Sequence, residues 1–474
     1  MLKHAKTREF YQKAEGFWSN IEYEGDMGLK VEGTDTLEVV GNYGTPVFLY
    51  SKKQIIENVS SLRNAFKDYP NTIIAYSTKT NSNLSIMRIL RDEGAYAEVC
   101  SGLDYHIAKK AGYKPGMVIY DGLAKQGHEL ENAIDDGVSI INVESTEELD
   151  KIDRIGCERG RTVSVGLRLG LGGVGASKFG FKALLGISYD RFGLDVDSGQ
   201  AYDALKKAAG MKGLKIEGLH VHIGSNLRDG GEYLPALRKI VQFMSRIDKG
   251  LGIKVRYINL GGGFGVRSVR QYSLVDVSWD ILRRAANLGS DHYLRDDGST
   301  IDAMGRAITK ELKRLCFEHS VEEPTLVLEP GRFIVGNSGI LLMRILSRKK
   351  THDGRIWLVA DGGTNIVPNN ILYNEYHQIL PVEKKDVGCE RVSISGPLMY
   401  GSDILAKDVT LPKLGEGDCI ALMDAGAYMM ALSHQLSNPR PCSVLVDGQS
   451  TRIIRGRETY DDVCANDVIG DGIF

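Results

Sequence analysis

The stretch TIIAYSTKTNSNLSIMRILRDEG, residues 72–94, decides how the fold of this chain is interpreted. A run of apolar and β-branched residues ends in Tyr-Ser-Thr-Lys, and an amphipathic helical pattern begins after Asn83. A strand followed by a helix is the repeating unit of a parallel α/β fold. Lys79 stands at the transition. It is either a solvated surface charge, which is the usual state of a lysine, or an amine at the mouth of a pocket.

The same pattern recurs over the first two thirds of the chain, where short apolar segments alternate with helix-length segments. The apolar segments are residues 72–77, 96–100, 117–121, 139–143, 162–169, 216–224, 255–260 and 325–329. Continuous apolar strands with helical connections predict a parallel sheet that is covered on both faces. Eight such strands can close into a (β/α)8 barrel. A doubly wound open sheet fits almost as well, but the spacing favours the barrel.

The last third of the chain has a different pattern of predicted elements. Short strands are separated by Gly and Asp turns with little helix between them, which predicts an antiparallel β-sandwich domain. Residues 28–33 form a predicted strand that could join this second sheet. We therefore expect an α/β barrel over residues 45–335 and a β domain built from residues 1–44 and 336–474. Residues 267–302 are typical of an insertion before the last barrel strand.

The composition excludes several classes of protein. The 474 residues carry 59 Lys and Arg against 61 Asp and Glu, a formal net charge of −2, so no basic field attracts nucleic acid or anionic lipid. Apolar runs long enough to span a membrane are absent from the sequence. The seven cysteines are scattered without CxxC pairs, which predicts reduced thiols and neither a disulfide framework nor a metal site. We expect a cytoplasmic protein that binds neither nucleic acid nor membrane.

Polar residues and glycines gather at the predicted carboxyl ends of the strands, where the functional residues of a barrel lie. They are Lys79, Cys100, Ser101, Asp121, Glu144, Arg168, His220, His222, Ser225, Gly261, Gly262, Gly263, Glu329 and Arg332. Glycines let backbone N–H groups approach phosphate oxygens, which Arg332 and Ser225 can also bind. A desolvated Lys79 can form a Schiff base, and Glu329 can hold a pyridine nitrogen protonated. Each residue alone is weak evidence, but together they predict a site for an aromatic cofactor that carries a phosphate.

Four motifs resemble those of the fold-type III pyridoxal-phosphate decarboxylases of basic amino acids, the group of diaminopimelate, ornithine and arginine decarboxylases. The motifs are AYSTKTN (75–81), HVHIGS (220–225), GGGFG (261–265) and EPGR (329–332). The resemblance covers nearly the whole chain. It implies a barrel of the alanine racemase type followed by a β-sandwich, with pyridoxal 5'-phosphate as cofactor and an amino-acid-type substrate. It also implies a homodimer in which the β domain contributes to active sites shared between protomers.

The resemblance further implies roles for individual residues. Lys79 would be the Schiff-base lysine, His222 would stack on the cofactor ring and Glu329 would contact its nitrogen. The residues expected to bind the cofactor are Lys79, Arg168, His222, Ser225, Gly261, Gly262, Gly263, Glu329, Arg332 and Tyr428, the last from a late motif at 424–441.

The chain departs from the family at the substrate end of the site. Where the family's interface motif carries a proton-donating cysteine and an acidic residue, this chain has Met399 and Tyr400. Methionine cannot donate a proton, and tyrosine cannot pair with an ammonium group as a carboxylate does. The arginine that grips the distal carboxylate in diaminopimelate enzymes is missing from residues 365–379, although Tyr373 is retained.

We therefore expect a divergent decarboxylase whose substrate is not diaminopimelate. Tyr373, Met399 and Tyr400 would line the substrate, and protonation would come from Tyr400, Lys79 or water. A cofactor enzyme that diverts the reaction to transamination and a non-catalytic regulatory homologue remain alternatives. A racemase is disfavoured, because the racemase branch has an arginine where this chain has Glu329.

Overall fold

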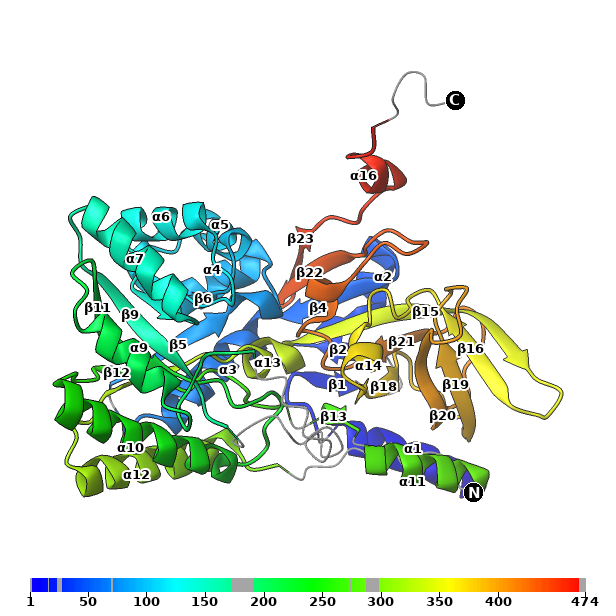
Figure 1. Ribbon diagram of the computed structural model, residues 1–474. Helices are drawn as coiled ribbons and strands as arrows, with labels where there is room; N and C mark the ends of the chain where they lie inside the picture. The colour runs from blue at the N-terminus through cyan, green and yellow to red at the C-terminus, as the bar shows by residue number, and fades with distance from the viewer. Residues whose placement is uncertain are drawn as a thin grey trace. The chain divides into compact units, whose positions relative to one another are not determined.

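The computed structural model describes residues 2–15, 17–23, 28–69, 71–172, 191–266, 268–272, 274–286 and 298–468. The chain divides into two compact units, which are described separately (Figure 1). The first unit contains residues 1–55, 267–296 and 335–474, and the second contains residues 56–266 and 297–334.

The second unit contains a closed parallel barrel. Its strands are β5 (Thr72–Ser77), β6 (Tyr96–Val99), β7 (Val118–Tyr120), β8 (Ile140–Val143), β9 (Val163–Gly170), β11 (Leu214–His220), β12 (Tyr257–Asn259) and β14 (Thr325–Leu328). Neighbouring strands pair in parallel, β14 pairs with β5, and the pairing of β8 with β9 closes the ring. The short strand β10 (Leu194–Asp195) extends β9 at its outer edge. All the predicted barrel strands are present, and the closed barrel is confirmed over the open sheet.

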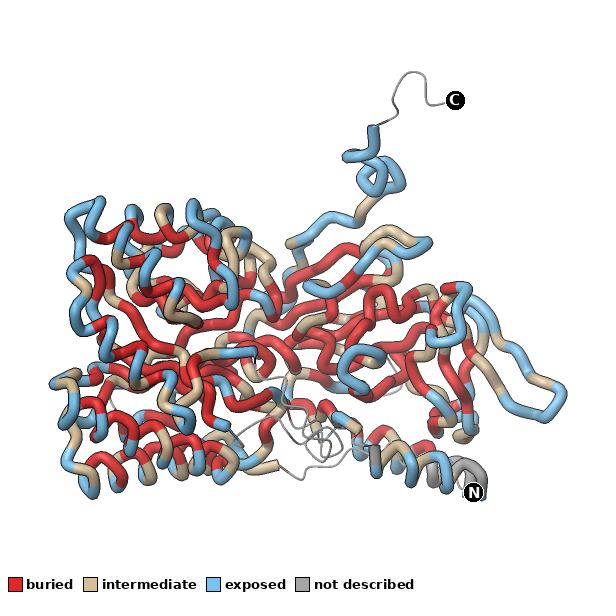
Figure 2. Tube along the Cα trace, in the orientation of Figure 1, coloured by how far each residue is buried: buried red, intermediate tan, exposed pale blue. Residues whose placement is uncertain are grey.

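Helices connect the strands. They are α4 (Leu84–Asp92), α5 (Gly102–Ala111), α6 (Gly127–Asp136), α7 (Thr146–Glu158), α9 (Gln200–Ala208), α10 (Leu234–Leu251) and α12 (Ile301–His319), while α3 (Lys52–Ala65) precedes the first strand. Figure 2 shows the strands buried and the helices buried along one side only, as amphipathic patterns require. At the start of α4 the Asn83 side chain accepts a hydrogen bond from the backbone N–H of Ser85. This cap starts α4 shortly after the turn η1 (Thr78–Thr80), which carries Lys79 just beyond β5.

The inside of the barrel is filled by side chains. Ala75, Ile119, Ile140, Tyr257 and Val327 form a buried apolar cluster at one level of the ring. Buried polar side chains of Glu98 on β6, Asn142 on β8, His220 on β11 and Asn259 on β12 lie nearer the carboxyl ends of the barrel strands. The barrel therefore has an apolar interior with a polar upper layer.

The first unit is dominated by a nine-stranded sheet. Its strands are β4 (Val47–Ser51), β15 (Gly339–Lys350), β16 (Ile356–Ala360), β18 (Ile379–Pro381), β19 (Cys389–Ser395), β20 (Ile404–Pro412), β21 (Cys419–Leu422), β22 (Cys442–Asp447) and β23 (Ser450–Arg455). Most pairs are antiparallel, but β16 with β19 and β4 with β22 are parallel. The C-terminal region is thus rich in β-structure as predicted, although its sheet is mixed and not purely antiparallel.

The N-terminal segment forms α1 (Leu2–Glu15), β1 (Ile21–Tyr23), β2 (Leu29–Val31), β3 (Thr34–Asp35) and α2 (Thr36–Tyr43). The predicted strand at 28–33 contains β2, which pairs with β1 and β3 in a separate small sheet. A bridge between Gly28 and Glu383 ties this sheet to the C-terminal segment. In the region predicted as an insertion, β13 (Arg270–Gln271) pairs with β17 (Glu375–Tyr376) and is followed by α11 (Leu274–Ala285).

Two further predictions concern the whole chain. Within the residues that the structure describes, no helix is both long and apolar enough to cross a membrane. All seven cysteines are free thiols, as their spacing predicted.

Candidate active site

Lys79 points its amine at the end of the neighbouring strand β6. The amine nitrogen Nζ lies 3.3 Å from each carboxylate oxygen of Glu98 and 3.1 Å from Cys100 Sγ. Glu98 is fully buried and also accepts hydrogen bonds from Ser77 Oγ at 2.5 Å and from Cys100 Sγ at 2.7 Å. Half of the Lys79 side chain remains exposed. The amine is therefore held by one buried carboxylate while it stays within reach of a ligand.

Cys100 contacts the same carboxylate. Burial and the charge of Glu98 raise the pKa of the Cys100 thiol, while the Lys79 charge acts in the opposite direction. The group next to the Lys79 amine is thus a protonated thiol rather than a thiolate.

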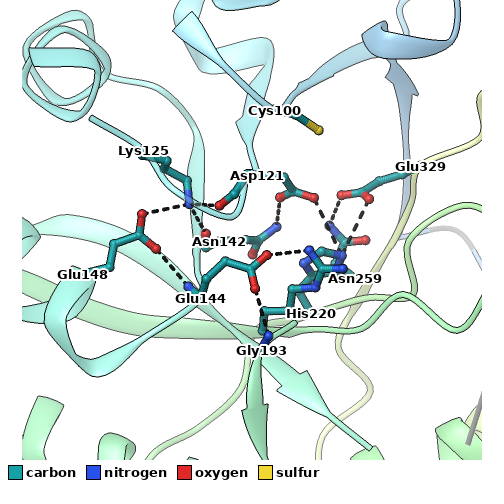
Figure 3. A network of polar contacts seen from close by, with 12 residues as sticks. Cys100, Asp121, Lys125, Asn142, Glu144, Glu148, Gly193, His220, Asn259 and Glu329 are labelled. Carbon is teal, nitrogen blue, oxygen red and sulfur yellow. Dashed lines mark hydrogen bonds and ion pairs between the residues drawn. The ribbon is translucent and has the colours of Figure 1, made fainter. Parts of the chain in front are cut away.

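Glu329 directly follows β14 and lies in a buried polar network, shown in Figure 3. Asn259 Nδ2 donates a hydrogen bond to Glu329 Oε1 at 2.5 Å. His220 Nε2 lies 3.6 Å from Glu329 Oε2 and 3.7 Å from Asp121 Oδ2. Asn142 Nδ2 donates to the other Asp121 oxygen at 2.6 Å. The network thus joins residues from five barrel strands, β7, β8, β11, β12 and β14, around one carboxyl group.

The network shifts the protonation of its members. Burial, followed by the negative charges of Asp121 and Glu98, raises the pKa of Glu329 well above its ordinary value. Burial and the positive charges of Arg168 and Lys79 lower the pKa of His220 well below its ordinary value. Both groups are therefore driven toward their neutral forms.

Arg168 on β9 is paired with Glu144 at the end of β8. Arg168 Nη1 donates to Glu144 Oε1, and Glu144 Oε2 accepts a hydrogen bond from the Gly193 N–H at 2.8 Å. The guanidinium carbon lies 4.6 Å from the centre of the Phe192 ring. The charge of Arg168 is consequently shared with a carboxylate, which fixes the direction of its side chain.

A second buried cation supports the same end of the barrel. Lys125 is fully buried, and its amine donates to Glu148 Oε1 at 3.0 Å, to the Gly122 carbonyl at 2.9 Å and to the Asn142 carbonyl at 2.7 Å. Glu148 in turn accepts a hydrogen bond from the backbone N–H of Glu144 at 2.8 Å. Three hydrogen bonds satisfy the ammonium group, so this lysine holds the loops after β7 and β8 together.

Gly261, Gly262 and Gly263 form the loop after β12. Gly261 and Gly263 have φ values of +66° and +95°, a conformation that favours glycine. A Cβ atom on Gly261 would lie 2.8 Å from His222 Nδ1, and one on Gly262 would overlap the Glu329 carbonyl oxygen. The loop is thus a cradle that only glycine permits, packed against His222 and Glu329, and it fits a phosphate-bearing cofactor.

His222 and Ser225 are exposed beyond β11, and Arg332 is buried at the start of α13 (Arg332–Val335). Although solvent reaches the His222 ring, surrounding protein atoms and the charges of Lys79 and Arg168 lower its pKa. This shift favours the neutral form of the His222 ring.

The remaining predicted residues lie in the first unit. The rings of Tyr373 and Tyr428 have centres 6.2 Å apart, and Tyr428 adopts a positive φ just before α15 (Met429–Leu432). Met399 is 100% exposed, and the Tyr400 hydroxyl is hydrogen-bonded to Thr364 Oγ1. The predicted residues therefore form two groups, one in each unit.

Several residues that support the site escaped the sequence-based prediction, among them Glu98, Lys125, Asn142, Glu148 and Asn259. The two asparagines interrupt otherwise apolar strands, in SIINV and YINL. A polar side chain inside a buried strand needs a partner, and this was the signal that could have identified them.

Comparisons with known proteins agree with this geometry. Residues 52–336 match the family model described as "Pyridoxal-dependent decarboxylase, pyridoxal binding domain". The diaminopimelate decarboxylase of Methanocaldococcus jannaschii is 32% identical over 445 residues, which cover 93% of this chain and 94% of the relative. That of Aquifex aeolicus is 32% identical over 442 residues, covering 93% and 96%.

Solved structures give the same result. The crystal structure of the M. jannaschii diaminopimelate decarboxylase matches with a TM-score of 0.85 at 30% identity, covering 96% of this chain and 99% of that chain. A structure of the same protein in complex with L-lysine also matches with a TM-score of 0.85, covering 95% and 98%. The predicted combination of barrel and β-rich C-terminal region is confirmed by these neighbours.

Proposed function

Since the chain belongs to the pyridoxal-dependent decarboxylase family, we propose that it removes the Cα carboxylate of an amino acid at the carboxyl end of its barrel, with Lys79 as the cofactor-binding residue. Family membership makes the chain a pyridoxal-phosphate-dependent carboxy-lyase. What we propose is the role of each individual residue in that reaction. The observation that supports this proposal is the position of the Lys79 amine. Lys79 lies just after β5, its amine is bound by Glu98 on β6, and it is on the same barrel rim as the Gly261–Gly263 loop and Glu329.

The residues of the second unit fit the cofactor part by part. The backbone of the Gly261–Gly263 loop, Ser225 and Arg332 would hold the phosphate, and the neutral His222 ring would lie against the pyridine ring. Glu329 would face the ring nitrogen, and Arg168 would lie near the cofactor on β9. When bound, pyridoxal 5'-phosphate supplies a ring that accommodates the electron pair left by the departing carboxylate.

Protons near the reacting carbon would be handled by side chains of this chain. Glu98 orients the Lys79 amine and accepts from Cys100, so one proton-rich cluster surrounds Lys79 Nζ. After the carboxylate leaves, Lys79 can return a proton to the substrate carbon, with Tyr400 and water as the other candidate donors.

We further infer that the substrate differs from diaminopimelate at its distal end. The support is chemical: Met399 offers a thioether where the family has a thiol, and Tyr400 offers a hydroxyl where the family has a carboxylate. The Tyr400 hydroxyl is bonded to Thr364, whose own hydroxyl donates to Asp403 Oδ1 at 3.0 Å. The proposal also includes a cytoplasmic homodimer with shared active sites, to which Tyr373, Met399, Tyr400 and Tyr428 would contribute.

Diaminopimelate itself is the second candidate substrate. It is favoured by the curated relatives, which are named diaminopimelate decarboxylase and match over more than nine tenths of this chain.

A substrate panel tests both candidates. The protein loaded with cofactor would be offered meso-diaminopimelate, lysine, ornithine, arginine and their N-acylated forms, and carbon dioxide release would be measured, with Lys79→Ala as the control. We expect release from one member of the panel other than diaminopimelate and none from the variant. Rapid release from diaminopimelate would refute the proposed substrate and support the second candidate. Cofactor binding without release from any compound would favour the regulatory homologue.

The fate of the reaction is tested in heavy water. A product that carries one solvent deuterium at Cα indicates protonation at that carbon, as a decarboxylase requires. Conversion of the cofactor to its amine form would instead indicate transamination.

A further inference from the structure

Three acceptor atoms converge below the candidate active site. They are Asp121 Oδ2, His220 Nε2 and Glu329 Oε2, which all lie within 4.8 Å of one another (Figure 3). Their residues are only 4%, 1% and 5% exposed. Within the part of the chain that the structure describes, neither ring nitrogen of His220 has a hydrogen-bond partner. The imidazole is thus an unsatisfied buried group aimed between two carboxyl groups.

The outer oxygens of the two carboxyl groups are already fixed. Asn142 Nδ2 donates to Asp121 Oδ1, and Asn259 Nδ2 donates to Glu329 Oε1. Asn259 is itself oriented by the Gly261 N–H, which donates to its Oδ1 at 2.9 Å. These bonds leave Oδ2 and Oε2 directed inward, and among the residues that the structure describes neither oxygen accepts a hydrogen bond from an amide.

Cations near the cluster are engaged elsewhere. Lys79 pairs with Glu98, Arg168 with Glu144 and Lys125 with Glu148. Other titratable groups around the cluster are His222, the thiol of Cys100 and the hydroxyl of Tyr257. Two buried carboxylates facing one another at this range repel strongly, and a retained proton removes that repulsion.

We propose that Asp121 and His220 are positioning residues that act through Glu329 by retaining one proton among the three side chains. The proton is taken from water in the cofactor-free protein. In the loaded enzyme Glu329 would face the ring nitrogen of the cofactor and would supply this proton to it, with no other bond changed. Only this last step rests on the proposed function.

The same three atoms could in principle hold a divalent cation. A histidine that ligates a metal almost always donates its other ring N–H to a carboxylate, a carbonyl or water. His220 Nδ1 has no such partner among the described residues. A proton fits the cluster better than a metal ion.

Infrared spectroscopy of the cofactor-free protein tests the inference. The difference between wild type and Glu329→Gln isolates the Glu329 carboxyl group, and we expect its protonated C=O band to persist at neutral pH. Asp121→Asn keeps the side-chain shape but removes the negative charge that helps Glu329 to retain its proton. The band of this variant should therefore disappear at a pH about one unit or more below that of the wild type. Asp104→Asn, which removes a carboxylate outside the cluster, should leave the band unchanged.

His220→Gln gives a second variant in case Asp121→Asn does not fold, which circular dichroism would report. Its amide offers N–H donors to both carboxylates, so it too should lower the pH at which the band disappears. In the loaded enzyme the alkaline limb of the kcat profile should move to lower pH in the variants.

Three results would overturn the inference: no Glu329 band at neutral pH in the wild type, an unchanged band in both variants, or a band that appears only after a chelator is added. Cofactor binding, measured separately by absorbance, keeps the two proposals distinguishable. A protein that shows the band but binds no cofactor contradicts the proposed function alone. One that binds cofactor and lacks the band contradicts only the inference.

Discussion

The protonation of Glu329 makes the stability of the folded protein depend on pH. Its pKa in the folded protein is raised well above the ordinary value by burial and by the charges of Asp121 and Glu98. The unfolded chain loses this proton near the ordinary value, so between the two pKa values only the folded protein binds it. By linkage, the free energy of unfolding then falls as pH rises through that window.

Replacement of Glu329 by glutamine should remove this dependence. Relative to wild type, the cofactor-free variant should gain on the order of 1 kcal/mol of unfolding free energy at about pH 8.5 and show little gain at about pH 5. Urea unfolding at the two pH values measures both differences. A gain of equal size at both would mean that the carboxyl group does not titrate differently in the folded protein.

The sequence located some residues of this site and missed others for a physical reason. Lys79 and Glu329 could be placed because the carboxyl ends of parallel strands meet at one rim. Asn142 and Asn259 contribute through side chains that point into the barrel. Their partners come from strands that are distant in sequence, so their role depends on the closed ring.

Among the elements, β12 packs closely against β9 and β11 through the side chain of Tyr257. Tyr257 on β12 lies against Gly166 on β9 and Gly218 on β11. A Cβ atom on Gly218 would overlap the Tyr257 ring, and one on Gly166 would overlap the Asn142 side chain. The glycines therefore make room for the ring that fills the barrel below the polar layer.

Gly218→Ala should consequently destabilise the protein by about 1–3 kcal/mol, because a rigid buried ring cannot move away without disturbing its neighbours. Gly116→Ala is the matched control, since its Cβ would meet nothing within 4 Å and its φ needs no glycine. Thermal or urea unfolding compares the two. Equal stability of both variants would show that the Tyr257 ring can be displaced at little cost.

The strand pairing of the barrel could be predicted from the sequence more completely than that of the nine-stranded sheet in the first unit. Each barrel strand is a continuous apolar run with a helix behind it, so its pairing partner is the next strand of the same kind. In the first unit β4, early in the chain, pairs with β15 and β22, which lie hundreds of residues later. Local patterns carry no information about such pairings, which is why the parallel pairs were missed.

For the molecule as a whole, the first unit joins the two ends of the chain. Residues from the N-terminal segment, including Tyr11 and Trp18, share one buried apolar cluster with β15, β21 and β22. Trp18 Nε1 donates to both carboxylate oxygens of Asp424, at 3.1 and 3.2 Å. Burial raises the pKa of Asp424, and the Trp18 hydrogen bond is one of the contacts that oppose this.

Trp18→Phe should therefore cost about 1–3 kcal/mol of unfolding free energy, because it leaves a buried carboxyl group with fewer donors. Trp279→Phe provides the control, since Trp279 is 66% exposed on α11 and should change stability little. Urea unfolding followed by circular dichroism measures both. Similar stability of the two variants would contradict a structural role for the Trp18–Asp424 contact.

The central claim is that Lys79 binds the cofactor, and the most direct test is to identify the modified lysine. The protein would be loaded with pyridoxal 5'-phosphate, reduced with borohydride so that the bond becomes irreversible, digested and mapped by mass spectrometry. The account predicts the pyridoxyl group on Lys79 and its absence in Lys79→Ala. A pyridoxyl group on another lysine of the barrel rim, such as Lys125, or on no lysine at all, would contradict it.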